Sequence, residues 1–362
     1  MHNDAIIKGS HLATPGLVDA HIHPNKTGWG SPWIPRKSAH SVADFIQNDR
    51  ETQLDLPLTV EERTFSLLSH ALANGTLAMR AHVDVSSELG LSHIEGVRAA
   101  AERLTPHLTV QIVAFPQFGL LTNPGTLDIM EASLSAGADL VGGIDPHGLE
   151  GDVNGHLDAI FRLADRAGRD LDIHLHDGGE IGLEQIRNIA TRTLAGGREG
   201  RVTIGHAFAL CDGSLPSLGR TLDSVADAGI WITTCALGPD PVPNLDLFEK
   251  HGVQLAVGSD GVRDSWSPFG TGSMVDRAHL LAYRTGAITD SDLERAFHLS
   301  SISGAQMMGV PDLIAWPHTR NDTRLEFAAN SVAELVVDRP APSRVIRHGN
   351  EVYTHSISLP DS

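Results

Sequence analysis

The 362-residue sequence contains only two cysteines, few basic residues and no long apolar run. Cys211 and Cys235 cannot form the disulfide framework that small secreted proteins use, so we expect a reducing compartment and a cytoplasmic location. No stretch approaches the roughly 20 apolar residues that a membrane helix needs. Residues 1–13 carry charges and lack the apolar core of a signal peptide. These absences argue against a membrane protein and against a disulfide-rich secreted scaffold.

Basic residues are outnumbered, with 27 Lys and Arg against 45 Asp and Glu, which gives a formal net charge of -18. Nucleic-acid-binding proteins need basic stripes, so this charge argues against such a partner. A hydrophobic content of 41% is ordinary for a globular protein. The length suits one large domain, or one large and one small. We expect a small-molecule substrate, and a homo-oligomer is compatible with the sequence.

Short apolar or β-branched runs alternate with longer helix-like segments along the chain. Eight runs are expected to form strands: 17–23, 77–85, 108–115, 139–144, 172–176, 202–206, 231–236 and 254–259. Strands that alternate with helices predict βα units around a parallel sheet, and eight of them predict a TIM (β/α)8 barrel. An open doubly wound sheet is disfavoured, because no Gly-x-Gly-x-x-Gly turn follows an early strand.

The segment after the barrel is expected to add two features. Asp290–Met308 predicts closing helices, and the segments 332–337 and 345–353 predict a strand pair with a turn at 347–350. Together with the few residues before the barrel, these strands predict a small, shortened β-sandwich formed by the chain termini. The expected division is therefore a barrel over residues 14–323 and a small β-domain made of 1–13 and 324–362.

Polar residues gather where the predicted strands end. His21 and His23 lie two residues apart on the first strand, so both project to the same face. Two converging imidazoles are half of a site for zinc or iron. Other strand ends carry further such side chains: His82 and Asp84, Gln117, the run from His174 to Asp177, His206, and Asp260. The carboxyl ends of barrel strands form the active-site face, so these residues predict one site.

This arrangement resembles the amidohydrolase superfamily, and within it the cytosine deaminases. The superfamily resemblance rests on His21-x-His23, His174, His206 and Asp260 at their respective strand ends. The runs Gln111-Ile112-Val113-Ala114-Phe115-Pro116-Gln117 and Gly258-Ser259-Asp260-Gly261 point to the cytosine deaminase branch. The resemblance extends over residues 14 to about 275.

The resemblance implies that His21, His23, His174 and Asp260 bind one divalent metal ion, zinc or iron. It also implies that His206 contacts the water activated by this metal. A metal ion lowers the pKa of bound water towards about 7, which makes hydroxide available at neutral pH. Many relatives hold two metals through a lysine on strand four, but residues 139–144 contain no lysine. A mononuclear site is therefore expected.

The resemblance also assigns roles in proton transfer and substrate binding. Related deaminases carry a glutamate three residues after the strand-five histidine, where this chain has Asp177. We predict Asp177 as the proton shuttle with Glu180 as its substitute, while His206 and Asp260 activate the water. Gln117 is expected to bind an amide-like edge of the substrate. The remaining candidates for substrate contact are Lys26, His82, Asp84 and Trp266, of which His82 and Asp84 could instead support the ligands.

The leading function is hydrolytic deamination of a cytosine-like nitrogen heterocycle. The alternative is hydrolysis of a cyclic amide, or removal of an N-alkyl amine from a triazine-like ring. A non-heme iron oxygenase is disfavoured, because such enzymes use three protein ligands. A catalytically weak protein that retains the metal and only binds its ligand is a further alternative. The histidines at positions 40, 147, 156 and 251 are expected at the surface.

Overall fold

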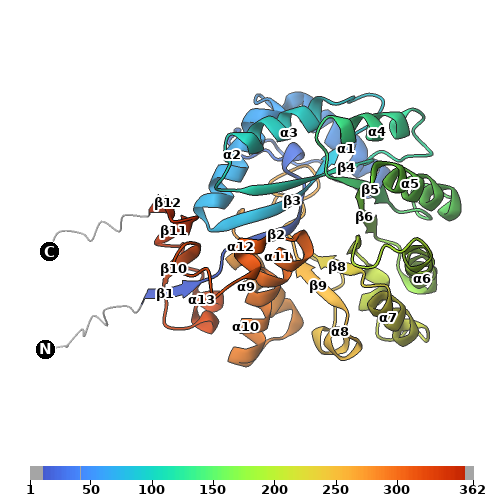
Figure 1. Cartoon of the computed structure of the whole chain (residues 1–362). Helices are drawn as coiled ribbons and strands as arrows, with labels where there is room; N and C mark the ends of the chain where they lie inside the picture. Colours follow the sequence, from blue (N-terminus) through green and yellow to red (C-terminus); the bar gives the residue numbers. More distant parts are fainter. Residues whose placement is uncertain (1–10, 41, 355–362) are drawn as a thin grey trace, which may run out of the picture.

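The computed structural model describes residues 11–40 and 42–354. Eight parallel strands form a barrel in which each strand pairs with the next one along the chain (Figure 1). They are β2 (Leu17–Ile22), β3 (Thr76–Asp84), β4 (Thr109–Phe115), β5 (Leu140–Ile144), β6 (Asp170–Leu175), β7 (Val202–His206), β8 (Trp231–Thr234) and β9 (Gln254–Val257). Each of the eight predicted runs forms a strand, so the predicted TIM barrel is confirmed.

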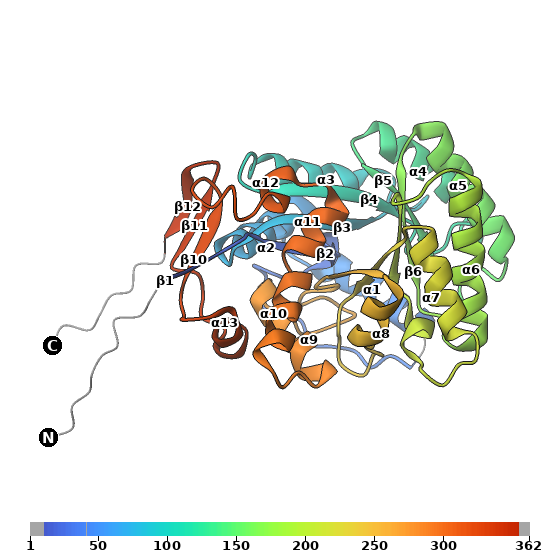
Figure 2. The same cartoon turned by 60° about the horizontal axis from the view of Figure 1, so that its bottom comes forward.

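Helices cover the outside of the barrel; those up to residue 251 connect successive strands, and the others follow the last barrel strand (Figure 2). They are α2 (Val60–Ala73), α3 (Ser92–Glu102), α4 (Thr126–Ser135), α5 (Val153–Ala167), α6 (Gly179–Ala195), α7 (Leu218–Asp227), α8 (Leu245–His251), α9 (Met274–Thr285), α10 (Asp290–Leu299), α11 (Ile302–Met308) and α12 (Pro311–Ile314). Local sequence sets their ends: Asp152 caps α5 by accepting from Gly155 N, and Gly168 ends it in the left-handed region.

The first and last barrel strands meet through the backbone of one residue. Asp260 N donates to His21 O at 2.8 Å, and His23 N donates to Asp260 O at 3.2 Å. A parallel bridge joins Ile22 to Asp260 at the same place. The backbones of His21, His23 and Asp260, three residues of the predicted site, therefore close the barrel at its carboxyl end.

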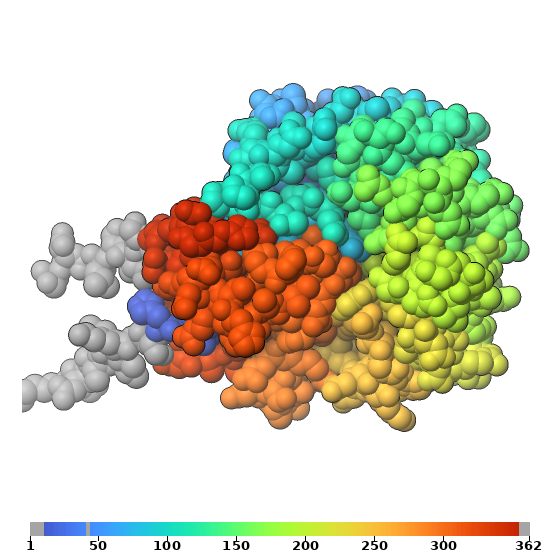
Figure 3. All heavy atoms as spheres, in the orientation of Figure 1, coloured from blue at the N-terminus to red at the C-terminus, as the bar shows by residue number. Residues whose placement is uncertain are grey.

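A second, smaller sheet lies beside the barrel in both views (Figures 1 and 2). It contains β1 (His11–Thr14), β10 (Arg324–Ala328), β11 (Arg344–Arg347) and β12 (Asn350–Thr354), which are antiparallel in that order. The predicted turn at 347–350 is confirmed, because Arg347 pairs with Asn350. Figure 3 shows the blue residues of β1 against the red residues of the other three strands of this sheet.

The prediction of a strand at residues 332–337 is wrong. This segment forms the helix α13 (Val332–Asp338). Ser331 caps it by accepting from Glu334 N, and the buried residues Ala333 and Val336 lie three positions apart, on one helical face. The β-branched residues Val332, Val336 and Val337 suggested a strand, but the cap and the helical spacing of the buried side chains prevail.

Arg347 connects the small sheet to the barrel. Its guanidinium group is buried and donates to the carbonyl oxygens of Leu77 and His107 at 2.5 and 3.0 Å, near the start of the barrel strands. It also pairs with Asp312, with Nε 3.2 Å from Oδ2. The two sheets are thus joined by a buried polar contact, and the division at residues 13/14 and 323/324 stays a prediction.

One helix near the predicted site was not expected from the sequence. The helix α1 (Val42–Asp55) follows the short helix η1 (Pro24–Lys26). Its Phe45 stacks on Trp266 at 5.0 Å, and its Arg50 lies 4.3 Å from the ring centre of Phe118. Through these contacts α1 packs on the loops that follow β9 and β4. Within residues 11–40 and 42–354, no helix has the length and apolar character needed to span a membrane.

Candidate metal centre

Four of the predicted metal ligands converge at the carboxyl end of the barrel. His23 Nε2 lies 3.1 Å from His174 Nε2 and 3.3 Å from Asp260 Oδ1. His21 Nε2 lies 4.0 Å from the same Asp260 oxygen. Two ligands about 2.1 Å from one tetrahedral ion would be about 3.4 Å apart, so these separations suit a shared ion. The structure thus brings together ligands from three strand ends, although 239 positions separate His21 from Asp260 in the sequence numbering.

The donor atoms at this point fit a divalent cation. His21 Nε2 is buried and has no hydrogen-bond partner among residues 11–40 and 42–354. Burial, followed by the neighbouring histidines or Lys26, holds the pKa values of His21, His23 and His174 well below their usual range. These imidazoles are therefore neutral at physiological pH, which is the form that binds metals. Three neutral histidines and one carboxylate can hold zinc or ferrous iron.

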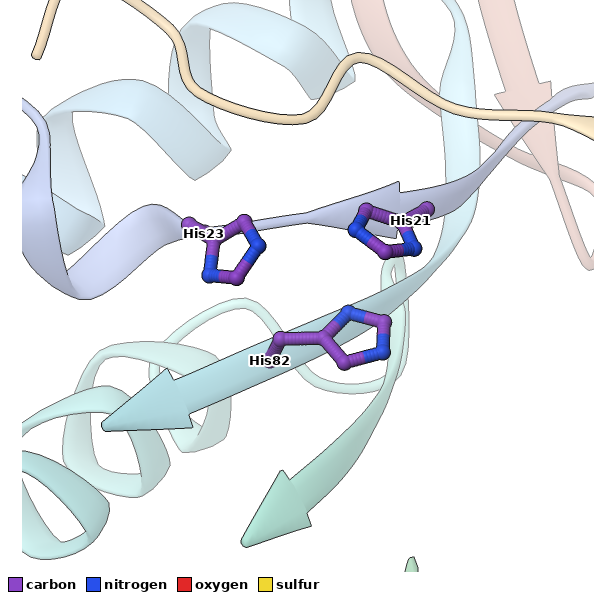
Figure 4. A group of neighbouring side chains, drawn as sticks. All are labelled: His21, His23 and His82. Atoms are coloured by element: carbon purple, nitrogen blue, oxygen red, sulfur yellow. The ribbon is translucent and has the colours of Figure 1, made fainter. Parts of the chain in front are cut away.

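His82 lies directly against this cluster. Figure 4 shows His21 near the end of one strand, His23 just beyond that end, and His82 on the neighbouring strand. The ring centre of His82 is 4.1 Å from that of His21 and 4.7 Å from that of His174. Its Nε2 lies 3.1 Å from Asp172 Oδ1, and both side chains are fully buried. Asp172 in turn accepts from Arg80 at 3.0 Å, so His82 connects the cluster to a buried polar network inside the barrel.

Asp19 connects the two segments that carry the predicted ligands His21 and Asp260. Its carboxylate is buried and accepts from the Ser259 hydroxyl, from Ser259 N at 2.9 Å and from His21 N at 3.3 Å. Burial raises the pKa of Asp19 to about 6, despite these hydrogen bonds and the nearby Arg277. Because Ser259 immediately precedes Asp260, this carboxylate fixes the two ligand-bearing segments relative to each other.

Several residues at the strand ends have positive φ angles, which residues with a side chain rarely adopt. The φ angles are 61° at Asp260, 66° at His206, 48° at Ala207, 48° at Ala236 and 32° at Asp145. L-residues with a Cβ atom rarely occupy this left-handed region. Such strain commonly gathers at functional sites, where the surrounding structure holds it in place.

His206 and His176 form a second group beside the ligands. Their ring centres lie 4.3 Å apart, and the ring of His206 lies 4.9 Å from that of His21. Burial, followed by His176, lowers the pKa of His206 well below its usual value, so its imidazole is neutral at physiological pH. His176 Nδ1 lies 2.8 Å from Asp145 Oδ2. Burial alone would lower the pKa of His176, but Asp145 outweighs it and raises this pKa.

The two carboxylates predicted for proton transfer make their hydrogen bonds elsewhere. Asp177 Oδ2 accepts from Gly148 N and from Gln185 Nε2, both at 3.0 Å. The exposed Glu180 accepts from Ser217 N at 3.2 Å, at the start of α6. None of these partners is a predicted metal ligand. The structure therefore brings Asp177 to the rim of the site and leaves Glu180 outside the ligand cluster.

Lys26 and Gln117 lie together under α1. Lys26 is buried, donates to Gln117 Oε1 and lies 3.6 Å from Asp84 Oδ1. Burial alone would lower the pKa of Lys26, but Asp84, Asp49 and Asp264 outweigh it and raise this pKa. Burial raises the pKa of Asp84 to about 6, even beside Lys26. The ammonium group also lies 5.4 Å from the ring centre of Trp266.

The sequence analysis missed two features of this site. Asp145 follows the predicted strand at 139–144 directly, so its position at a strand end was a usable signal. Asp19 lies within the same short segment as His21, but an aspartate beside a strand histidine has many possible roles. The hydrogen bonds from Asp19 to Ser259 cross 240 positions, and only the three-dimensional structure reveals them.

Comparison with known proteins agrees with this geometry. The sequence matches the amidohydrolase family over residues 10–315. It is 33% identical to N-isopropylammelide isopropyl amidohydrolase of Pseudomonas sp. (strain ADP), covering 85% of this chain and 77% of that protein. N-isopropylammelide isopropylaminohydrolase from Burkholderia multivorans ATCC 17616 superposes with a TM-score of 0.90 at 38% identity, covering 95% and 87%. 5-Methylcytosine deaminase from Klebsiella pneumoniae superposes at 0.83 with 22% identity, covering 97% and 88%. The predicted resemblance to amidohydrolases with cytosine deaminase-like relatives is confirmed.

Proposed function

Because the chain belongs to the amidohydrolase family and is a hydrolase of carbon–nitrogen bonds other than peptide bonds, we propose that it removes an exocyclic amine from an oxo-substituted nitrogen heterocycle. The observation that carries this proposal is the convergence of His21, His23, His174 and Asp260 on one point. We assign one divalent cation, zinc or iron, to these four residues. When bound, the cation supplies acidified water at neutral pH.

His206 and Asp260 accept the proton of the attacking water in this proposal. His206 is suited to this role because its imidazole is neutral, and it lies beside the ligand His21. For the proton that the leaving nitrogen needs, we keep Asp177 as the shuttle and Glu180 as its substitute. Asp177→Asn should then lower kcat and leave the metal content unchanged, whereas Glu180→Gln should change kcat only if Glu180 replaces Asp177.

Lys26 and Gln117 define the substrate edge in this proposal. Lys26 donates to Gln117 Oε1, and among the described residues Gln117 Nε2 makes no hydrogen bond. This edge therefore offers N–H donors, which match ring oxo oxygens and ring nitrogens. Asp84 keeps Lys26 charged and in place, and Trp266 supplies an aromatic wall beside it. We assign His82, which is fully buried, to supporting the ligands from inside the barrel.

Two forms of the reaction share this site. Removal of an N-alkyl amine from a triazine-like ring comes first, because relatives at 33% and 38% identity are named for an N-isopropylammelide amine hydrolysis. Deamination of a cytosine-like ring comes second, because the motifs at the strand ends resemble those of cytosine deaminases. Both need the same attack of water on a ring carbon that bears an exocyclic amine, and they differ in the ring and in the substituent on the leaving nitrogen.

A product screen on metal-loaded protein tests the proposal. The purified chain is reconstituted with zinc or with ferrous iron, and metal bound per chain is measured. It is then incubated with N-alkylamino-dioxotriazines, cytosine, 5-methylcytosine and a pterin, and with a cyclic amide that has no exocyclic amine. We expect one metal per chain and oxygen-independent release of alkylamine or ammonia. His174→Ala should abolish both metal binding and release.

Other results would overturn the proposal. Hydrolysis of the cyclic amide alone would identify a ring-opening amidase. Oxygen-dependent turnover would identify an oxygenase. Metal binding with ligand binding and no turnover of any compound would identify a binding protein that has kept the metal centre.

A further inference from the structure

Glu150 is a buried carboxylate that the proposed chemistry does not use. It lies in the loop between β5 and α5, and its side chain is fully buried. Its oxygens accept from the backbone nitrogen of Leu120, from those of Leu121 and Thr122 at 2.9 and 3.1 Å, and from the Thr122 hydroxyl at 3.3 Å. Three consecutive backbone N–H groups thus enclose one carboxylate, as in an anion-binding nest.

His156 completes the surroundings of this carboxylate. The expectation that His156 lies at the surface is wrong: it is fully buried, with Nδ1 3.1 Å from Glu150 Oε1. Ile144 N donates to His156 Nε2 at 3.3 Å, so the other ring nitrogen, Nδ1, is the one that donates to Glu150. Burial alone would raise the pKa of Glu150, but hydrogen bonds from His156 and from the loop backbone lower it to about 2. The carboxylate therefore remains ionised at physiological pH.

The loop that Glu150 holds is the one that carries Gln117. After β4 the chain turns sharply, with Gln117 N donating to Phe115 O and Gly119 N donating to Pro116 O. Gly119 has a φ of 95°, which favours glycine at this turn. Gln117 lies on the inner side of the turn, against Lys26, and residues 120–122 lie on the outer side, against Glu150. The turn is thus held from both sides.

We propose that Glu150 is a positioning residue that fixes the turn after β4 and thereby places Gln117 for binding the oxo edge of the substrate. The proposal rests on the proposed function in so far as Gln117 binds substrate. Glu150 lies in a different βα loop from Gln117 and holds residues 120–122 of the turn through their backbone nitrogens and the Thr122 hydroxyl. Its effect should therefore appear in substrate binding and selectivity, and not in metal binding.

The test combines Glu150→Gln with Gln117→Ala in a double-mutant cycle. We expect Glu150→Gln to raise KM about tenfold, equivalent to one substrate hydrogen bond, with kcat changed less than twofold and metal content unchanged. In the Gln117→Ala background the same substitution should add little, because the residue that it places is gone. Asp152→Asn is the matched control: its carboxylate lies in the same loop but caps α5, so KM should not change.

Hydrogen exchange separates this proposal from the proposed function, since it needs no substrate. Glu150→Gln should accelerate amide exchange in residues 116–122, and Asp152→Asn should not. If Glu150→Gln does not fold, Glu150→Asp replaces it in the test. Aspartate keeps the charge on a side chain that is one methylene shorter, so this variant should raise KM by less. Unchanged exchange in 116–122 would overturn the proposal. So would a tenfold rise in KM that persists in the Gln117→Ala background, or a loss of stability without any change in KM.

Discussion

Removing the Asp19 carboxylate should weaken metal binding more than it weakens the fold. Asp19 ties His21 N to both the backbone and the hydroxyl of Ser259, the residue before the ligand Asp260. Partners of this kind orient metal ligands, and their loss typically lowers metal affinity about 10–100-fold. We therefore expect Asp19→Ala to lower metal affinity about 100-fold and Asp19→Asn about 10-fold.

The expected change in stability depends on the side chain that replaces Asp19. The pKa of Asp19 rises from 3.8 to about 6 on folding, although three hydrogen bonds to the carboxylate lower it. The ionised carboxylate therefore costs about 3 kcal/mol at neutral pH, with those hydrogen bonds already counted. Asparagine removes the charge and keeps the shape, so Asp19→Asn should leave the free energy of unfolding unchanged or raise it by up to about 3 kcal/mol. Alanine leaves Ser259 N unpaired, so Asp19→Ala should cost about 1–3 kcal/mol.

The assay is competition for zinc with a chromophoric chelator, together with denaturant unfolding of the metal-free protein. Asp139→Ala is the matched control, because Asp139 Oδ2 accepts from Ile112 N at 2.8 Å near the opposite end of the barrel. It should lower stability and leave zinc affinity unchanged. Equal stability losses for Asp19→Ala and Asp139→Ala, with zinc affinity unchanged in both, would refute the reasoning.

Three further predictions follow from the structure. Arg347→Met should cost about 3–5 kcal/mol, because it removes the ion pair with Asp312 and leaves the carbonyl oxygens of Leu77 and His107 without this donor. The partly exposed Arg344→Met on the same strand should change little in denaturant unfolding, and equal losses would contradict this. Removing the metal should lower the Tm measured by calorimetry. Adding metal at 100 times its Kd should raise the free energy of unfolding of the wild type by about 2.7 kcal/mol and should not change that of His174→Ala. Because folding lowers the pKa of Glu150 from 4.5 to about 2, its ionised carboxylate stabilises the fold above about pH 4.5, and this stabilisation is lost as the pH falls towards 2. Glu150→Gln should therefore make the free energy of unfolding depend less on pH between about 4.5 and 2, and an unchanged dependence would contradict this assignment.

The barrel could be predicted because its signals are local. Each strand is a short apolar run, and several begin just after a glycine that ends the preceding helix, such as Gly75 and Gly229. α1 escaped prediction because it has few apolar residues at helical spacing, and it is held by contacts such as the stacking of Phe45 on Trp266. The strand expected at 332–337 failed for the opposite reason, since valine runs suit both strands and buried helical faces.

Part of the site could also be predicted, because strand alternation and barrel topology decide which residues share one end of the barrel. Strand alternation places His21 and His23 on one face, and barrel topology brings His174 and Asp260 to the same end. The orientation of a side chain beyond the strand end depends on partners far away in the sequence. Asp177 could be located at the rim, but its hydrogen bonds to Gly148 and Gln185 could not be foreseen. The buried position of His156 likewise depends on its contact with Glu150.

The left-handed backbone at the strand ends has a consequence for engineering this protein. A residue with a Cβ atom in the left-handed region costs roughly 1–2 kcal/mol more than glycine at the same position. These residues at the carboxyl ends of the strands therefore lower the stability of the fold. At His206, Asp260 and Asp145 the side chain is needed, and the strain must remain. At Ala207 and Ala236 only a methyl group is at stake. A search for more heat-resistant variants should therefore begin with glycine at these two positions, where stability can be recovered without removing any of the chemistry.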